Sequence, residues 1–169
     1  LAKAIENFAA QYPTTESVVY DPVSYSGMLN ANEKSFGKRA IPSYDFSKAD
    51  VIASFGADFL GTWLNDQKNT AEYSKNRVPT KENPSMSTHF QVESLMSVTG
   101  SNADYRFTMK SADEGVLLAS LYNKIADHAG VAGLTNTKSL ELAGNGISQM
   151  AKALWAAKGK SLVVSGSND

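Results

Sequence analysis

The chain has 169 residues, and its 16 Lys and Arg residues nearly balance its 17 Asp and Glu residues, which gives a formal net charge of −1. This balance removes the electrostatic case for nucleic acid as a partner, and no apolar run approaches the roughly 18 residues that a membrane-spanning helix needs. A hydrophobic fraction of 42% is ordinary for a globular domain, and the absence of Cys excludes disulfides, thiolate catalysis and Cys-held iron–sulfur clusters within these residues.

The first part of the chain predicts two helices and one short strand. Apolar residues recur at helical spacing from the first residue, and Tyr12-Pro13 ends that helix. Residues 17–20 form a β-type run. Residues 24–36 predict a second helix, which ends at Gly37.

The middle of the chain alternates strands with polar segments. Residues 49–55 are the clearest strand, and residues 67–77 predict a polar surface helix. Residues 78–87 are rich in Pro, Lys, Asn and Ser, which indicates an exposed loop. Residues 88–92 and 105–110 alternate between apolar and polar residues, as strands do.

The last part of the chain is mainly helical. Ser111 and Glu114 have the spacing of a capping box, which predicts the start of an amphipathic helix that continues through Ala126. The remaining predicted elements are helices over residues 137–143 and 147–157 and a strand over residues 161–164.

Strands and helices alternate with short links, which predicts an α/β fold. We expect a mainly parallel sheet with helices on both faces, a Rossmann-like three-layer sandwich, as a single domain over residues 1–169. The chain opens inside a helical pattern and stops after an apolar strand whose loop normally leads to another helix. We therefore expect a segment excised from a longer protein, with a complete small protein as the alternative.

No motif predicts catalysis or metal binding. His89 and His128 are far apart and lack the spacing of metal ligands, so each is expected to be an ordinary strand or surface residue. The sequence contains no Gly-x-Ser-x-Gly nucleophile elbow, and no pair of carboxylates forms a recognisable acid–base couple. The predicted sets of catalytic and metal-binding residues are therefore empty.

The strongest local signal is a glycine-containing turn directly after the strand at 49–55. Such turns lie at the carboxyl edge of a parallel sheet, where α/β folds bind ligands. Glycines there would let the backbone approach a phosphate or a pterin, but Gly-x-Gly-x-x-Gly is absent and Asp58 puts a negative charge where a pyrophosphate would lie. A cofactor loop and a structural turn both stay open. The candidate crevice residues, with those of a second small polar loop, are Gly56, Ala57, Asp58, Gly61, Gly100, Ser101 and Asn102.

Two segments carry a family resemblance. Residues 43–65 (SYDFSKADVIASFGADFLGTWLN) and 87–126 (STHFQVESLMSVTGSNADYRFTMKSADEGVLLASLYNKIA) resemble the molybdopterin-oxidoreductase-like large iron–sulfur subunit of alternative complex III, a bacterial quinol-oxidising membrane complex. The closing GKSLVVSGSND fits the same family.

The chain departs from the cofactor-binding members of that superfamily at three landmarks. The usual Gly-x-Asn-Pro after the first strand is Gly56-Ala57-Asp58-Phe59 here, and the usual Asp-Pro-Arg is replaced around Glu93. The usual Arg-Pro-Gly-Thr-Asp is replaced by a segment that ends at Glu114. The resemblance implies that the subunit lacks molybdopterin, and these replacements agree with a vestigial crevice.

Three functions follow from these observations. The first is a cofactor-less structural domain of the respiratory subunit, which supports electron transfer by iron–sulfur clusters elsewhere in the parent chain. The second is a genuine domain for molybdopterin guanine dinucleotide, and the third is a free nucleotide-binding module of flavodoxin or Rossmann type. Under the first, the resemblance implies as partners other domains of the parent subunit and other subunits of the complex, without nucleic acid or direct membrane insertion. It also implies a location at the outer (periplasmic) face of the cytoplasmic membrane.

Overall fold

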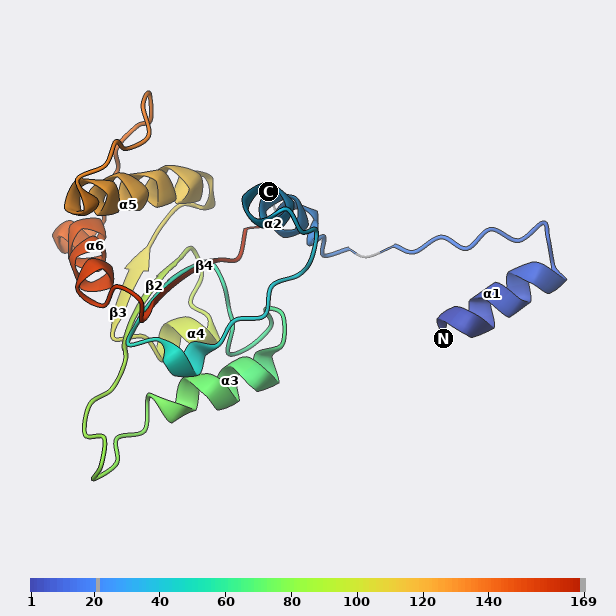
Figure 1. Cartoon of the computed structure of the whole chain (residues 1–169), viewed down its shortest axis with the longest axis horizontal. Helices are drawn as coiled ribbons and strands as arrows, with labels where there is room; N and C mark the ends of the chain where they lie inside the picture. The colour runs from blue at the N-terminus through green and yellow to red at the C-terminus, as the bar shows by residue number, and fades with distance from the viewer. Residues whose placement is uncertain (21, 168–169) are drawn as a thin grey trace. The chain divides into compact units, whose positions relative to one another are not determined.

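The structure is a computed structural model that describes residues 1–20 and 22–167 (Figure 1). These residues divide into two units, Leu1–Ile41 and Pro42–Ser167. The α/β architecture lies in the second unit, so the candidate site is built from that unit.

The smaller unit contains two helices, both as predicted. Helix α1 (Ala2–Gln11) stops before Pro13, and helix α2 (Ser26–Phe36) ends at Gly37, whose φ of +67° suits a residue without a side chain. The strand predicted at residues 17–20 is wrong. Its two Val and one Tyr side chains are 78 to 90% exposed, and no neighbouring strand among the described residues pairs with it.

The larger unit is built on a four-stranded sheet in the order β3-β2-β1-β4, with every neighbouring pair parallel. This confirms the predicted α/β sandwich with a parallel sheet. The strands are β1 (Val51–Phe55), β2 (Thr88–Glu93), β3 (Tyr105–Thr108) and β4 (Ser161–Ser165).

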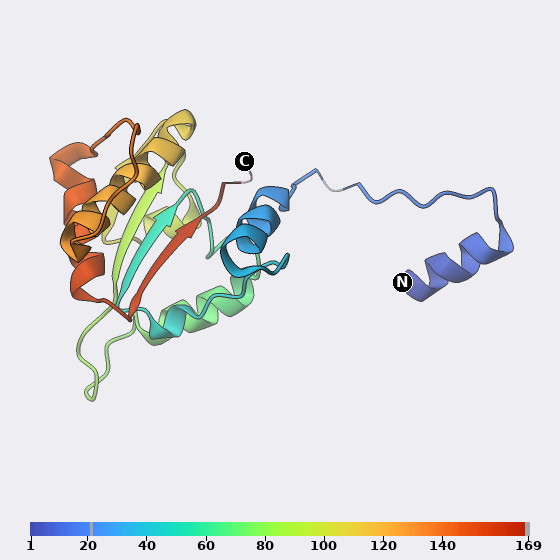
Figure 2. The ribbon, with the colours of Figure 1, turned by 45° about the horizontal axis from the view of Figure 1, so that its top comes forward.

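Helices cover both faces of this sheet (Figure 2). Helices α5 (Glu114–Ala129) and α6 (Gly146–Ala156) pack on one face, where the main apolar core lies. Helix α3 (Asp66–Lys75) and the short α4 (Val98–Ser101) lie on the other face. Three short 3₁₀ turns complete the unit: η1 (Phe46–Lys48), η2 (Ser111–Asp113) and η3 (Ala143–Asn145).

The register places residues of alternate parity on the two faces. Val51 of β1 is opposite Thr88 of β2 and Ser161 of β4. Every residue of β1 is buried, as expected of a central parallel strand. On the α5 and α6 face the sheet contributes Val51, Ala53, Phe55, Phe90 and Val92 to the core.

The helix predicted at residues 137–143 is wrong. This segment is irregular up to η3 because side chains, not a helical ladder, satisfy its backbone. The Leu140 N–H donates to Ser120 Oγ (2.9 Å). The Glu141 carboxylate accepts the N–H groups of Leu142 (3.0 Å) and Ile147 (2.6 Å), which ties the segment to the start of α6.

The predicted capping box is also wrong, although the helix that it was expected to open is present. Ser111 to Asp113 form η2, and α5 begins only at Glu114. The Ser111 hydroxyl donates to Ser94 Oγ (3.3 Å), and the Glu114 carboxylate accepts from the Ser165 hydroxyl (2.8 Å). One side chain therefore binds Ser94, directly after β2, and the other binds Ser165, the last residue of β4. The start of α5 has no side-chain cap.

The other predicted elements are confirmed to within a few residues, and residues 78–86 are exposed as expected of a loop. Among the described residues, no helix combines the length and the apolar character that crossing a bilayer requires.

Candidate functional site

The four parallel strands end at one edge of the sheet, called the carboxyl edge below. β1 is followed there by Gly56, β2 by Ser94 and β4 by Gly166. Gly56 has φ +60° and donates its N–H to the Val92 carbonyl (2.8 Å), while Gly166 donates to the Phe55 carbonyl (2.8 Å). A Cβ on Gly166 would lie 2.6 Å from the Gly56 carbonyl oxygen, so the turns after β1 and β4 pack directly on each other.

The turn after β1 folds back on itself. The Asp58 carbonyl accepts the N–H groups of Gly61, Thr62 and Trp63 at 2.9 to 3.0 Å, and Ala57 is fully buried. The Asp58 carboxylate occupies the space that a side chain on Gly61 would need. Only glycine at position 61 leaves room for this carboxylate. The Gly61 N–H already donates to the Asp58 carbonyl within the turn.

The Asp58 carboxylate joins the two loops that contain the candidate residues. Its Oδ1 accepts the backbone N–H of Thr99 (3.0 Å) and the Thr99 hydroxyl (2.8 Å). The Thr99 oxygen in turn accepts the Leu60 N–H (2.9 Å). Thr99 is fully buried, so these bonds lie in the interior of the carboxyl edge. A carboxylate of the chain thus occupies this backbone donor.

A second carboxylate, that of Glu93, organises the loop after β2. It accepts the Ser97 N–H (3.2 Å), the Ser97 hydroxyl (2.6 Å) and Arg106 Nε (2.6 Å). Burial raises the pKa of Glu93, but the bonds from Ser97 and Arg106 outweigh it and hold that pKa below its ordinary value. Gly100 packs so closely on this carboxylate that a Cβ there would collide with Glu93 Oε1.

The last two candidate residues, Ser101 and Asn102, bind within their own loop. The Ser101 hydroxyl (2.7 Å) and Asn102 Nδ2 (2.9 Å) both donate to the carbonyl of Val98, the first residue of α4. The Asn102 carbonyl accepts from Arg77 Nη2 (3.3 Å). Their hydrogen-bonding groups are thus used to shape the loop.

A buried polar ladder leads along β2 to Glu93. Gln91 Nε2 donates to Glu93 Oε2 (3.2 Å), so the other amide atom, Gln91 Oε1, faces His89 Nε2 (3.3 Å). Because Gln91 Oε1 can only accept, His89 Nε2 carries the ring proton. His89 Nδ1 is then an acceptor that faces the Tyr73 hydroxyl (3.0 Å), whose single proton also faces the Asn102 carbonyl (3.2 Å). Burial lowers the pKa of His89 to about 4 and raises the pKa of Tyr73 to about 12, so both are neutral near pH 7.

Sequence reasoning missed this ladder. His89 is fully buried and its ring is hydrogen bonded at both nitrogens, whereas His128 is exposed on α5. The available signal was the alternation of His89, Gln91 and Glu93 with Phe90 and Val92. A central parallel strand is covered on both sides, so the polar residues of this alternation need partners inside the protein.

A third carboxylate completes the acidic lining of the edge. Glu114 Oε2 lies 3.4 Å from the position of a Cβ on Gly56, and burial raises the pKa of Glu114 even though Ser165 donates to it. Asp58, Glu93 and Glu114 thus approach the edge from the turn after β1, the end of β2 and the start of α5. This lining opposes an anionic ligand, and the residues present do not fit a pyrophosphate-linked cofactor.

Among residues 1–20 and 22–167, no group of three or more His, Asp or Glu side chains is arranged to hold a metal ion. No protein-family model matches the chain, and no curated protein matches it. The class of protein is therefore defined by the fold alone, as a Rossmann-like α/β sandwich with a parallel sheet.

Proposed function

We propose that this chain is a cofactor-less structural domain of the molybdopterin-oxidoreductase-like large iron–sulfur subunit of alternative complex III. In this role it supports electron transfer by holding neighbouring parts of the respiratory subunit in place, and it performs no chemistry of its own. The observation that carries the proposal is the bond from the Thr99 N–H and hydroxyl to the Asp58 carboxylate. In this proposal the Asp58 carboxylate takes the place of a bound phosphate.

Electrostatics supports the absence of a pyrophosphate-linked cofactor at this edge. A phosphate charge about 4 Å from a carboxylate near a protein surface meets roughly 4 kcal/mol of repulsion. Asp58 and Glu114 line the edge and form no ion pair with any described residue, so a pyrophosphate would meet this repulsion from both. Glu93 adds little to this repulsion, because the Arg106 guanidinium is paired with it at 2.6 Å and offsets its charge.

The family resemblance supplies the rest of the proposal. It implies that the parent chain carries iron–sulfur clusters outside these residues, which contain no Cys. Its partners would be other domains of that subunit and other subunits of the membrane complex. Its location would be the outer face of the cytoplasmic membrane.

The test is the molybdenum, pterin and iron content of the intact parent protein, measured by elemental analysis and by the fluorescence of oxidised pterin. We expect iron in several-fold excess over protein, with molybdenum and pterin below about a twentieth of one equivalent per chain. Near-unit molybdenum and pterin would overturn the cofactor-less function. Iron at background level would overturn membership in an iron–sulfur subunit.

A further inference from the structure

An unusually apolar stretch is exposed at the carboxyl edge, in the loop after β2. Leu95 is 82% exposed, Met96 68% and Val98 55%. Scattered apolar residues on a surface are ordinary, but three large exposed ones within four consecutive residues are a concentration of the kind found at interaction sites. The same loop is otherwise composed of small polar residues.

Partly buried hydrogen bonds hold this loop in one conformation. The Glu93 carboxylate binds Ser97, and the Ser97 oxygen accepts the Gly100 N–H (2.9 Å). On the far side of the loop, Asp58 binds Thr99. A partner that contacts the loop would therefore pay little entropy to order it, which is a property of efficient binding surfaces.

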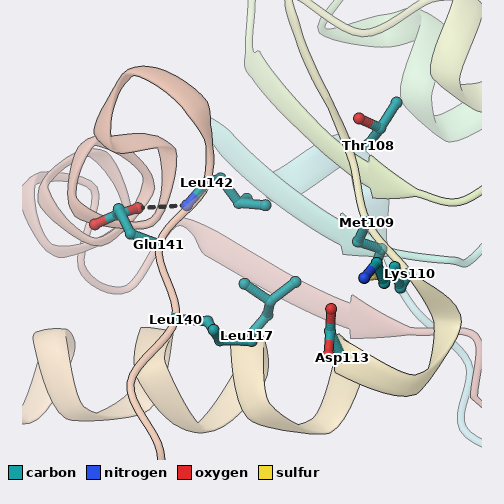
Figure 3. Close-up of a pocket in the computed structure, with 8 residues that line it drawn as sticks. All are labelled: Thr108, Met109, Lys110, Asp113, Leu117, Leu140, Glu141 and Leu142. Atoms are coloured by element: carbon teal, nitrogen blue, oxygen red, sulfur yellow. Dashed lines mark hydrogen bonds between the residues drawn. The ribbon is translucent and has the colours of Figure 1, made fainter.

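A pocket of about 420 Å³ is lined by the segment that borders this loop, at Met109, Lys110 and Asp113 (Figure 3). The two features are joined because the Met109 N–H donates to the Glu93 carbonyl (3.1 Å) and the Ser111 hydroxyl donates to Ser94 (3.3 Å). Figure 3 shows an apolar wall opposite Met109 and Lys110. That wall consists of Leu117, Leu140 and Leu142.

The charges around the pocket favour a basic partner. Asp113 and Glu141 line it against the single ammonium of Lys110. Glu141 is bonded to the start of α6, where it accepts uncharged N–H and O–H groups and keeps its negative charge. Asp113 forms no ion pair with any described residue. An anionic lipid surface is disfavoured here, since it requires a cluster of Lys and Arg.

We propose that Leu95, Met96 and Val98, together with this pocket, form one docking surface for a polypeptide that presents an aliphatic side chain beside an Arg or Lys. The three exposed side chains and the leucine wall contact the aliphatic residue and its neighbours, and Asp113 faces the cation. This surface, called the Leu95 surface below, rests on the proposed function in that a structural domain must contact its neighbours. It does not depend on the molybdenum content of the parent protein.

The test uses fluorescein-labelled eight-residue peptides with Leu beside Arg, a matched set with Leu beside Glu, and fluorescence polarisation with the whole chain. We expect the Arg peptides to bind at least tenfold more tightly than the Glu peptides. The double variant Leu95→Ser with Met96→Ser should weaken the Arg peptides about tenfold, and Asp113→Lys should reverse the preference between the two sets. Val131→Ser, at a side chain 58% exposed on the loop after α5, is the matched control and should change nothing.

Each alternative outcome overturns the proposal. Equal binding of both peptide sets, or binding that the Leu95 and Met96 changes leave unaltered, would remove this surface as the site. Binding of wild-type protein to vesicles of phosphatidylcholine and phosphatidylglycerol that the double variant abolishes would identify a lipid surface instead. A dimer at micromolar concentration that the double variant dissociates would identify a second copy of the chain. The variants leave Asp58, Glu93 and Glu114 in place, so none of these results changes the molybdenum test.

Discussion

Replacing Asp58 tests how strongly its carboxylate holds the carboxyl edge together. In Asp58→Ala the Thr99 N–H, which belongs to a fully buried residue, loses its acceptor, and the Thr99 hydroxyl loses another. An unpaired buried donor costs about 1 to 3 kcal/mol, and the lost hydroxyl bond adds about 1 kcal/mol. We expect the free energy of unfolding to fall by about 2 to 4 kcal/mol. Asp58→Asn keeps a neutral acceptor and should lose only about 1 kcal/mol.

Urea unfolding followed by Trp fluorescence measures these differences. Trp63 is a suitable reporter because it is 7% exposed and its ring lies 5.5 Å from that of Tyr44, within the same region as the Asp58 turn. Asp127→Asn, an exposed carboxylate near the end of α5, is the control and should stay within about 0.5 kcal/mol of wild type. An Asp58→Ala protein as stable as wild type would refute the structural role. A more stable one would indicate a residue retained for binding at the expense of stability.

Three further predictions concern β2 and its loop. The pKa of His89 is about 4 in the folded protein and about 6.5 when unfolded, so the unfolded state takes up a proton first as the pH falls. Stability should therefore drop between pH 6.5 and 4 by about 3 kcal/mol from this residue, and His89→Gln should flatten that part of a denaturation series measured against pH. Gly100→Ala should destabilise the protein by at least about 2 kcal/mol, because the new Cβ collides with the Glu93 carboxylate. The control Gly115→Ala, in α5, places a Cβ with no atom within 4 Å and should be neutral or stabilising in thermal melts. Glu93→Gln should cost about 3 kcal/mol in urea unfolding by leaving the Arg106 guanidinium without its carboxylate, and a loss equal to that of an exposed Glu would contradict the inferred pairing.

The fold was predictable because its strongest signals are local. The all-apolar run at β1 followed at once by Gly56 has few alternatives to a buried parallel strand and its turn. The amphipathic pattern of α5 likewise identifies a helix that covers a sheet. Alternation of such elements with short links leaves a parallel sheet as the economical arrangement, and the structure has one.

The errors arose where side chains distant in sequence determine the backbone. Residues 137–143 have helical spacing, but the acceptor for Leu140 is Ser120 on α5, which no local pattern reveals. Ser111 and Glu114 have capping-box spacing, yet they bind Ser94 and Ser165 across the carboxyl edge. Tertiary contacts overrode local preference in both cases.

The site was predictable in part. The turn after β1 and the loop around Gly100 could be identified, and the charge of Asp58 was recognised as an obstacle to a pyrophosphate. Its partner Thr99 lies 41 positions away, so the bond between them needed the folded chain. The role of Gly100, which is to accommodate the Glu93 carboxylate, likewise depends on the packing of the loop against the end of β2.

If the chain's own carboxylates exclude a phosphate ligand from the carboxyl edge, the protein should not bind a guanine nucleotide there. Thermal unfolding of the whole chain is measured with and without millimolar guanosine diphosphate. A ligand at a hundred times its dissociation constant stabilises by about 2.7 kcal/mol, which corresponds to a rise of roughly 5 to 10 °C for a domain of this size. We expect a shift below about 1 °C. A rise of several degrees that Gly56→Val abolishes would contradict it.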